Sequence, residues 1–537
     1  MAREEFDYIV VGGGSSGCVV AAKLVAGNHR VLLLEAGHSH RHPLLDMPPG
    51  IFKMINGSKF MRYHTTVPQQ HLEGRAHDIP QGNVLGGGSS VNAQVYIRGR
   101  PSDYDEWHEI MRGNNDGADW SWKAVLPHFR GMEGNNRLHD ERHGANGPLL
   151  VSDPAHVNDV SRWFLQAMQV LGEPYNHDFN GPTQRGVGLY QFMNRSGKRS
   201  SAAYAFIEPL KDDPRLTLRL NAEVSRIIVE NGRAVGVAYR RDGQDQIAYA
   251  SGEIIVSSGA LVTPKLLMLS GIGPADQLKS HGIDCLVDLP GVGSNLIDHP
   301  EVPIAAIANG RYGYFGEGVG WRMLRNGIQF KLFGTGPILS AGVEAGAFVN
   351  PTDPDAPPTI QAFCVPIVYL DRDTKTLIKD THGFTITTVV VKPKSRGTVQ
   401  LRSADPAAMP LVSPNLLLDE RDMHEMMAGV RFFLRAFHTS PLAERIDHVA
   451  ILGDAPDDEA VRLHCRRFVK TNYHPAGTCR MGADGDPMVV LDARMRVRGV
   501  DRLRVCDMSS VPNINAGNTN APAMMLGDRC ASFIMGQ

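Results

Sequence analysis

The pattern of apolar residues at the start of the chain predicts a strand, a helix and a second strand within about 30 residues. Residues 8–11 form a short apolar run that stops in a glycine-rich stretch, and residues 18–25 follow with helical character. Residues 30–35 then form a second apolar run that is typical of a buried strand. This order is typical of a βαβ unit, whose two strands are parallel.

A different pattern, in which apolar and polar residues alternate, appears farther along the chain. Residues 226–230 and 234–239 alternate like strands, and Asn231-Gly232 between them is a hairpin turn signal. The stretch from about residue 301 to residue 467 carries further alternating runs, such as residues 384–391. We expect this stretch to form a mostly antiparallel sheet with helices.

Composition bounds the class of protein. The chain has 537 residues, more than the roughly 250–300 at which one hydrophobic core stops growing, so we expect two domains or one with a large insertion. A net charge of −2 gives no field of one sign that would suggest nucleic acid or an anionic membrane as a partner. The seven scattered cysteines include no CxxC pair, and the histidines lack metal-ligand spacing, so we expect neither a disulfide framework nor a metal site.

The N-terminus and the apolar runs bear on location. The first strand begins almost at once after Met1, which leaves no room for a signal peptide. No apolar run approaches the ~18–20 residues that a transmembrane helix needs. We therefore expect a cytoplasmic protein without a transmembrane segment.

The glycine-rich stretch has the spacing of a dinucleotide-binding turn. Gly12 permits a tight turn, Gly14 lets the backbone approach a pyrophosphate, and Gly17 lets helix and strand pack closely. The helix N-terminus then stabilises phosphate charge, and Glu35 at the end of the next strand can accept hydrogen bonds from an adenosine ribose. An ordinary βα turn is the alternative, and the fingerprint alone does not distinguish NAD from FAD.

Three further segments make the chain resemble the glucose–methanol–choline (GMC) oxidoreductases, a family of FAD enzymes. They are residues 82–95 (GNVLGGGSSVNAQV), residues 259–273 (GALVTPKLLMLSGIG), and the pair formed by residues 474–482 (HPAGTCRMG) and 517–522 (GNTNAP). Together with the N-terminal fingerprint they follow the family's order and leave little of the chain outside its pattern. The resemblance implies that the cofactor is FAD.

The resemblance also implies which residues bind the cofactor. Val84 and residues 92–95 line the flavin. Val224 contacts the adenine through its backbone, and Asp507 lies near the phosphate and ribitol. A strand-end cap is the alternative for Asp507, and an ordinary core aromatic is the alternative for Tyr473. With the fingerprint included, the expected cofactor-binding residues are Gly12, Gly14, Ser15, Ser16, Gly17, Glu35, Val84, Asn92, Ala93, Gln94, Val95, Val224, Tyr473 and Asp507.

The mode of flavin attachment follows from one position. In some family members a histidine attaches the flavin covalently at the position that Val91 occupies here. Valine has no nucleophile, so we expect the FAD to be non-covalent.

Alcohol oxidation by a flavin needs the hydroxyl proton removed while hydride from the α-carbon reaches flavin N5. Imidazole suits the proton step because its pKa lies near neutral pH. By resemblance His474 is the catalytic base, and Asn518 matches its partner, which is His or Asn in relatives. We expect Asn518 to hold the substrate oxygen by a hydrogen bond.

The sequence narrows the substrate and the electron acceptor only to broad classes. Several segments resemble the choline dehydrogenase-like branch, including sorbose and polyethylene glycol dehydrogenases, and both catalytic motifs are similar to those of hydroxymethylfurfural oxidases. A primary or sugar-like alcohol is expected, giving an aldehyde or ketone, with choline left open. A quinone or dye-type acceptor is favoured over oxygen, and a non-redox hydroxynitrile lyase is a remote alternative. Glu344 could face a cation or hydroxyl groups, with a structural salt bridge as an equal alternative.

The expected architecture is α/β. A Rossmann-like FAD-binding domain is assembled from residues 1–155, 210–300 and 468–537. An inserted α+β substrate domain, built on an antiparallel sheet, takes residues 156–209 and 301–467. The active site is then expected where the two domains meet.

Overall fold

The N-terminal apolar runs form the centre of a five-stranded parallel sheet. The computed structural model describes residues 4–113, 117–371 and 373–536, and its strand order in this sheet is β11-β3-β2-β15-β26. Val10 lies beside Leu33 on one side and Ile255 on the other, and the outer pairs are parallel as well. The predicted βαβ unit is confirmed. The strands are β2 Tyr8–Val11, β3 Val31–Leu34, β11 Leu216–Arg219, β15 Ile254–Val256 and β26 Leu503–Val505.

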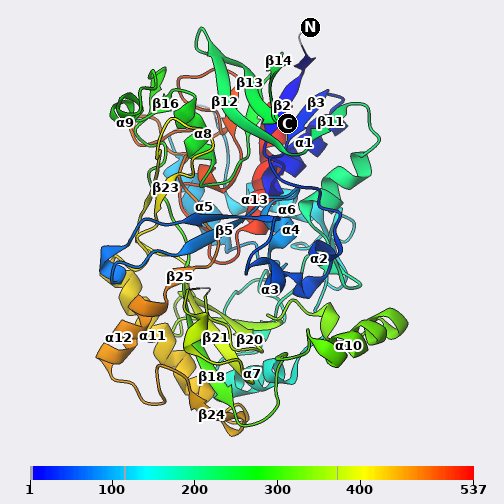
Figure 1. Cartoon of the computed structure of the whole chain (residues 1–537), viewed down its shortest axis with the longest axis vertical. Helices are drawn as coiled ribbons and strands as arrows, with labels where there is room; N and C mark the ends of the chain where they lie inside the picture. The colour runs from blue at the N-terminus through cyan, green and yellow to red at the C-terminus, as the bar shows by residue number, and fades with distance from the viewer. Residues whose placement is uncertain (1–3, 114–116, 372, 537) are drawn as a thin grey trace.

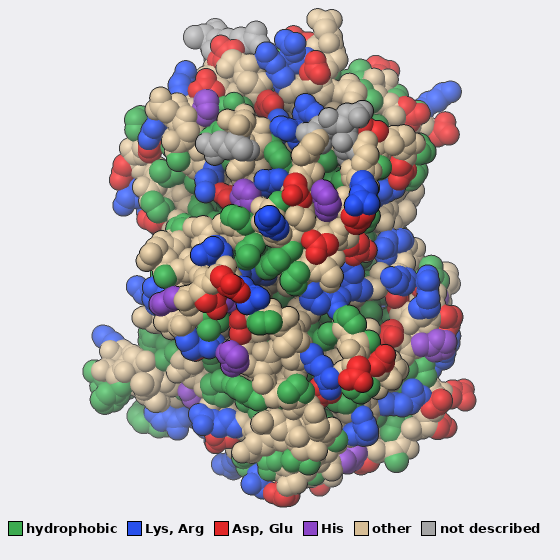
Figure 2. All heavy atoms as spheres, turned by 180° about the vertical axis from the view of Figure 1, so that it is seen from behind, with side chains coloured by type: hydrophobic (Ala, Val, Ile, Leu, Met, Phe, Trp, Pro, Cys, Tyr) green, Lys and Arg blue, Asp and Glu red, His purple; other side chains and the backbone are tan. Residues whose placement is uncertain are grey.

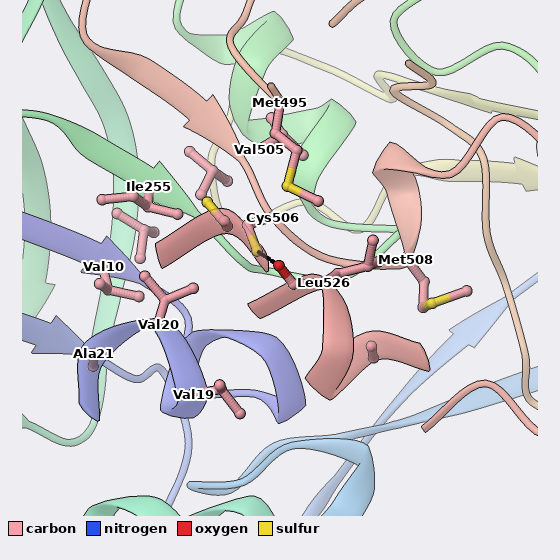
Figure 3. Close-up of a cluster of buried hydrophobic side chains, with 14 of the residues drawn as sticks. Val10, Val19, Val20, Ala21, Ile255, Met495, Val505, Cys506, Met508 and Leu526 are labelled. Carbon is pink, nitrogen blue, oxygen red and sulfur yellow. Dashed lines mark hydrogen bonds between the residues drawn. The ribbon is translucent and has the colours of Figure 1, made fainter. Parts of the chain in front are cut away.

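Two helices from opposite ends of the chain bury the apolar side chains of this sheet. Helices α1 (Ser15–Ala26) and α13 (Asn520–Ile534) lie side by side near the strands (Figure 1). Figure 3 shows Val20 of α1, Val10 and Ile255 of the strands and Leu526 of α13 in one buried cluster. The Sγ of Cys506 donates a hydrogen bond to the Leu526 carbonyl oxygen across it, at 3.4 Å. Burial of these side chains from both ends of the sequence joins the two termini into one domain.

The predicted Asn231-Gly232 hairpin is also confirmed. It joins β12 (Ala222–Glu230) to β13 (Arg233–Arg241), with Glu230 opposite Arg233. Asn231 has φ 51° and Gly232 has φ 74°, and two positive φ angles are what a type I′ hairpin turn requires. With β1 (Glu5–Phe6) and β14 (Gln244–Ala250) the hairpin makes a four-stranded sheet.

The expected antiparallel sheet forms the other half of the molecule, at the bottom of Figure 1. Its order is β24-β18-β21-β20-β19-β8, with β25 paired to β18, and every pair is antiparallel. Helices α7 (Asp159–Val170), α11 (Glu420–Phe437) and α12 (Asp458–Phe468) share a second buried apolar cluster with it. The strands are β8 Gly186–Leu189, β18 Pro300–Ala308, β19 Ala345–Val349, β20 Ile360–Val365, β21 Gly383–Val390, β24 Ile446–Val449 and β25 Lys470–Thr471.

The two hydrophobic clusters bear on the domain boundaries. The π-helix Ala203–Ile207 falls in a segment that we expected in the substrate domain, yet its Phe206 and Ile207 are buried in the cluster around the parallel sheet. The helix lies against α1, which explains this placement. We propose that the boundary expected at residue 209 belongs near residue 193, where side chains start to join that cluster.

One helix projects from the antiparallel half. Helix α10 (Gly320–Phe333) extends to the right in Figure 1, and Asn326 is its one buried residue. Of the helices within the described ranges, none combines the length and the apolar character that crossing a bilayer requires.

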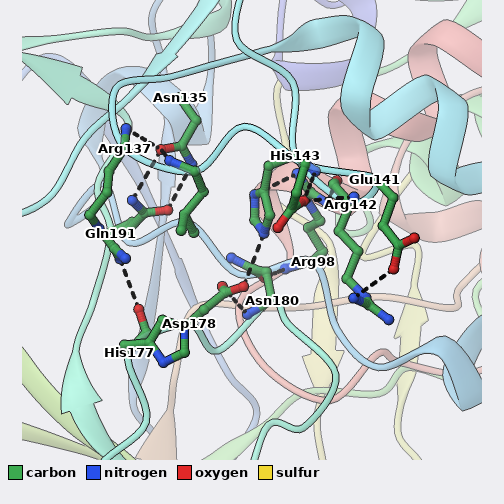
Figure 4. Close-up of polar contacts among 12 residues, drawn as sticks. Arg98, Asn135, Arg137, Glu141, Arg142, His143, His177, Asp178, Asn180 and Gln191 are labelled. Carbon is green, nitrogen blue, oxygen red and sulfur yellow. Dashed lines mark hydrogen bonds and ion pairs between the residues drawn. The ribbon is translucent and has the colours of Figure 1, made fainter.

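A buried ionic network connects chain segments that are far apart in the sequence. Glu133 accepts a hydrogen bond from Arg98, and its carboxylate lies 3.0 Å from Nδ1 of His143. Nε2 of His143 lies 3.1 Å from Asp178, and Figure 4 shows Arg98, His143 and Asp178 close together. Burial alone would raise the pKa of Glu133, but Arg98 and His143 hold it below its usual value. Arg98 also donates its backbone N–H to Asn180 at 2.8 Å. The network therefore fixes the strand-like segment that follows residues 92–95.

Replacement of Glu133 tests how much this network contributes to the stability of the fold. Glu133→Gln leaves Arg98 and His143 in the interior without their carboxylate, and we expect the free energy of unfolding to fall by about 3 kcal/mol. The matched control is Glu141→Gln, because Glu141 is 78% exposed and pairs with Arg142 at the surface; it should stay within about 1 kcal/mol of wild type. Equal denaturation midpoints for the two variants would contradict a structural role for the buried network.

Candidate active site

A cavity lies between the carboxyl ends of the parallel strands and the antiparallel sheet. Its walls include Glu35 just after β3, Phe363 on β20, and His474. Ligands of open α/β sheets bind at the carboxyl ends of the strands, and pockets commonly form between domains. Fourteen of the sixteen expected site residues line this cavity, and the other two are Gly17 and Val84.

The turn between β2 and α1 accepts only glycine at two positions. Gly12 has φ 99°, and a Cβ on it would lie 2.4 Å from the carbonyl oxygen of Ser257. A Cβ on Gly17 would lie 2.0 Å from the carbonyl oxygen of Gly12. Gly17 thus lets α1 pack onto the turn, which explains why it lies behind the cavity wall.

The N-terminus of α1 opens onto the cavity. The first backbone bond of the helix runs from the Cys18 N–H to the Gly14 carbonyl, so the preceding N–H groups have no helical partner. Ser15 donates its hydroxyl to Asn520 at 2.6 Å, and Ser16 donates its hydroxyl to the Ala523 carbonyl at 2.7 Å. These bonds bring the N-termini of α1 and α13 together, and such a position attracts an anion.

Glu35 is tied to the backbone around it. Its two carboxylate oxygens accept hydrogen bonds from the N–H of Gly13 at 2.8 Å and of Gly37 at 2.7 Å. Burial raises the pKa of Glu35, and these two hydrogen bonds oppose that effect. A carboxylate oxygen can accept more than one hydrogen bond, so Glu35 retains acceptor capacity towards the cavity that it lines.

Residues 92–95 form another part of the cavity wall. Gln94 takes the left-handed conformation, with φ 67°, and its Oε1 accepts a hydrogen bond from Asn194 at 2.9 Å. Its Nε2 is buried and has no hydrogen-bond partner among the described residues. Val84 lies behind this wall in an apolar cluster with Leu45 and Val91.

Asp507 and Val224 both line the cavity, with different surroundings. Asp507 Oδ2 accepts hydrogen bonds from the Gly259 N–H at 2.9 Å and the Thr263 hydroxyl at 2.6 Å. Its Oδ1 accepts one from the Ser509 N–H at 2.7 Å, so the carboxylate also caps the following turn. Val224 sits at an irregularity in the pairing of β12 with β13.

Polar contacts surround His474. Its Nδ1 lies 3.0 Å from Nδ1 of His299, and its Nε2 lies 3.5 Å from Nδ2 of Asn518. Its backbone N–H donates to Asp298 Oδ1 at 3.0 Å. The two expected catalytic residues, far apart in the sequence, are therefore brought together at one wall of the cavity.

The partners of His299 determine where the protons lie. Nε2 of His299 is 3.0 Å from the Val391 carbonyl and 3.1 Å from the Asn515 carbonyl, so that nitrogen must carry the proton. Burial lowers the pKa of His299 to about 4, so the ring is neutral and its Nδ1 accepts. His474 must then donate from Nδ1, which leaves a lone pair on its Nε2.

Asn518 has its own orienting partner. Gln361 donates its side-chain N–H to Asn518 Oδ1 at 3.1 Å, which turns Nδ2 of Asn518 towards Nε2 of His474. The lone pair of His474 and the N–H of Asn518 therefore face each other at the cavity wall. A substrate hydroxyl placed there could donate to His474 and accept from Asn518.

The environment keeps His474 neutral. Burial is the main reason that the pKa of His474 lies well below its usual value, and the nearby His299 and Lys470 act in the same direction. Lys470 pairs with Glu301 at 2.9 Å, and both are buried. A neutral imidazole is the form that can accept a proton.

The wall next to His474 is aromatic and apolar. The hydroxyls of Tyr369 and Tyr473 are 3.2 Å apart, and Lys470 Nζ lies over the Tyr473 ring at 4.6 Å. Phe363 and Val365, two residues apart on β20, also line the cavity. This wall suits an uncharged, apolar group.

Glu344 is not part of this wall. Its Oε2 accepts a hydrogen bond from Ser161 at 2.8 Å, and its Oε1 accepts from Tyr314 and Ser340. It is fully buried and lies outside the residues that line the cavity. The carboxylate therefore binds three hydroxyl groups of the protein itself and forms no ion pair with any described residue, so of the cation, hydroxyl and salt-bridge alternatives it meets protein hydroxyls.

Sequence reasoning did not identify His299, Gln361 or Lys470. His299 is one of 21 histidines, and Gln361 lies in an apolar strand. Nothing in the local sequence distinguishes these residues, because their partners come from other segments of the chain. Within the described residues, no cluster of histidine, cysteine, aspartate and glutamate could hold a metal ion.

Comparisons with known proteins identify the family. The GMC oxidoreductase N- and C-terminal family models match residues 6–301 and 393–527. The chain belongs to the GMC oxidoreductase family. An alcohol dehydrogenase [acceptor] of Pseudomonas putida is 39% identical, with 99% of this chain and 96% of that protein covered. The mitochondrial choline dehydrogenase of Mus musculus is 35% identical, with 100% and 90% covered.

Solved structures of GMC oxidoreductases share the whole fold. Pyridoxine 4-oxidase from Mesorbium loti superposes with a TM-score of 0.88 at 28% identity, over 99% of both chains. A formate oxidase of Aspergillus oryzae superposes with a TM-score of 0.89 at 26% identity, over 99% and 98% of the chains. The expected α/β class and the expected family are confirmed, and the chain is an FAD-dependent oxidoreductase acting on CH–OH groups.

The cavity fits the FAD that the GMC family implies. The N-terminus of α1 offers N–H groups to a diphosphate, and Glu35 offers carboxylate oxygens to ribose hydroxyls. Gly87 has no side chain and lies against Gly14, since a Cβ on it would be 2.8 Å from the Gly14 Cα. The unpartnered Nε2 of Gln94 offers a donor to a polar atom of the ring. These four features lie along the same cavity as His474.

Proposed function

We propose that this GMC oxidoreductase converts a neutral primary alcohol to an aldehyde, with His474 as general base. The carrying observation is that Nε2 of His474, which bears the lone pair, lies 3.5 Å from the Nδ2 of Asn518 at the cavity wall. A hydroxyl at this point gives its proton to His474, and Asn518 stabilises the charge left on the oxygen. When bound, FAD supplies the acceptor, at N5, for the hydride that leaves the α-carbon.

The proton has a defined place after transfer. It resides on Nε2 of His474, whose other nitrogen already donates to His299. His299 cannot turn away without breaking its bonds to the Val391 and Asn515 carbonyls, so it holds His474 in one tautomer. Asn518 has no titratable proton, so the pair contains a single base.

The charge distribution supports an alcohol with an apolar body. A quaternary ammonium binds over the faces of aromatic rings. Here the Tyr473 ring already carries Lys470, and Glu301 on that side is paired with the same lysine. Sugars need many polar partners, whereas Phe363 and Val365 offer none.

Anaerobic bleaching of the flavin by a panel of alcohols tests the substrate and the acceptor. We expect benzyl alcohol and 1-octanol to reduce the flavin at least about tenfold faster than choline or sorbose. Reoxidation by a quinone-type dye should outpace peroxide formation in air, as the name of the P. putida relative supports. Fastest bleaching by choline would overturn the substrate, dominant peroxide would identify an oxidase, and no bleaching by any alcohol would overturn the reaction.

Replacement of His474 tests the base. His474→Ala should slow flavin reduction by at least ~10²-fold, the usual scale of general base catalysis. The control is His464→Ala, since His464 is also buried but bonds the Pro303 carbonyl away from the cavity; its rate should stay within about twofold. Wild-type reduction should be independent of pH from about 6.5 upwards, because a lowered pKa keeps the base unprotonated there. A rate that still rises between pH 7 and 9 would contradict the assignment.

The same cavity supports a non-covalent flavin. Val91 ends α4 (Gly88–Val91), lines the cavity and carries no nucleophile, and none of the described lining residues is a cysteine. We therefore expect acid precipitation of the purified protein to leave the yellow colour in the supernatant. Colour that stays with the pellet would show a covalent link.

A further inference from the structure

Helix α10 and the residue before it concentrate exposed apolar side chains. Of the fifteen large apolar residues that are exposed in the described chain, seven lie between Val319 and Phe333. Trp321 is 73% exposed and Leu332 is 67% exposed. Figure 2 shows this projection, with green side chains, at the lower left edge of the molecule. A patch of this kind marks an interaction surface.

Four of these seven residues form an ordered stripe. Trp321, Leu324, Ile328 and Leu332 are spaced by three and four residues, which places them on one face of the helix. This is the spacing that usually faces a protein core, yet all four are exposed. The stripe thus resembles a packing face whose partner lies outside the chain.

The opposite face of α10 is anchored, so the stripe has a fixed direction. Asn326 donates from Nδ2 to the Glu317 carbonyl at 3.1 Å and to the Glu317 carboxylate at 2.8 Å. The Phe330 ring packs against Gly197, where a Cβ would be 3.0 Å from it. Rotation that buried the stripe would break both contacts.

The charges beside the stripe select its partner. Residues 320–333 contain Arg322, Arg325 and Lys331 and no acidic residue, although the whole chain has a net charge of −2. Glu317 pairs with both arginines, at 3.3 and 2.9 Å, so the segment keeps a positive excess. A second copy of the chain meeting this face symmetrically would bring like charges together. Anionic lipid complements both the apolar stripe and the basic edges.

We propose that α10 docks this protein on the surface of an anionic lipid bilayer, with Trp321, Leu324, Ile328 and Leu332 inserted among the lipids. The helix has 14 residues, or about 21 Å at 1.5 Å per residue, so it lies in the interface and does not cross it. The inference is independent of the proposed alcohol oxidation.

The docked helix leads directly to the cavity wall. Residues 334–340 connect α10 to Ala341 and Val343, which line the cavity, and include the turn Pro337–Leu339. Phe52, another lining residue, packs against Gly342, where a Cβ would be 2.5 Å from its ring. Docking therefore places this side of the cavity close to the lipid surface, where apolar molecules are concentrated.

Vesicle binding tests the proposal. Holoenzyme is mixed with vesicles of phosphatidylglycerol and phosphatidylcholine, or of phosphatidylcholine alone, and bound protein is measured by sedimentation. We expect at least about tenfold tighter binding to the anionic vesicles, weakened by salt. Brominated lipid should quench the fluorescence of Trp321, because Trp107 and Trp120 are buried and the remaining two tryptophans are partly buried. Trp321→Phe should remove that quenching.

Two matched triple variants test whether vesicle binding depends on the stripe or on exposed apolar side chains in general. Leu324→Ser/Ile328→Ser/Leu332→Ser should lower vesicle binding at least about tenfold. Ile247→Ser/Leu286→Ser/Leu418→Ser, at exposed apolar sites elsewhere, should bind as wild type does. Dye-linked alcohol oxidation without vesicles should be unchanged in both, so loss of docking and loss of catalysis are distinguishable. Wild-type protein that stays unbound with both vesicle types, or a dimer that the stripe variant abolishes, would overturn the proposal.

Discussion

The hydrogen bond between His299 and His474 joins the two halves of the molecule at the wall where the proposed base lies. His299 directly precedes β18 of the antiparallel sheet. Its Nε2 donates to the carbonyl of Val391, which follows β21, and to the carbonyl of Asn515, which precedes α13. Because carbonyl oxygens only accept, the proton of His299 cannot lie elsewhere, and His474 has to donate to it. The seam between the two halves of the molecule thus sets the protonation of the residue on which the proposed chemistry depends.

Burial makes this arrangement chemically useful. An imidazole in water titrates near neutral pH, whereas desolvation lowers the pKa of His474 and keeps its lone pair available. The same desolvation would penalise Lys470, but the buried Glu301 holds the pKa of that lysine above its usual value. Lys470 therefore stays positively charged near His474, and its charge disfavours protonation of His474. Desolvation thus favours the neutral form of His474, the proposed base.

The FAD-binding half and the antiparallel half contribute different parts of the function. Glycines at the ends of parallel strands bring the backbone close to a nucleotide, which local geometry alone explains. The substrate wall depends on which side chains of β20 and β21 face the seam, together with Tyr369 and Tyr473. Helix α10 belongs to the second half, so an interaction there lies on the substrate side of the cavity.

The sequence by itself determined the βαβ unit, the Asn231-Gly232 hairpin, the family and fourteen cavity residues, because periodicity, turn chemistry and motifs are local properties. His474 and Asn518 are two of these fourteen, and motifs singled them out, although their contact was only expected. Tertiary structure alone decided the tautomer of His474, the orientation of Asn518 by Gln361 and the structural role of Glu344. Each depends on hydrogen bonds between residues far apart in the chain, and no local pattern encodes which distant donor meets which acceptor.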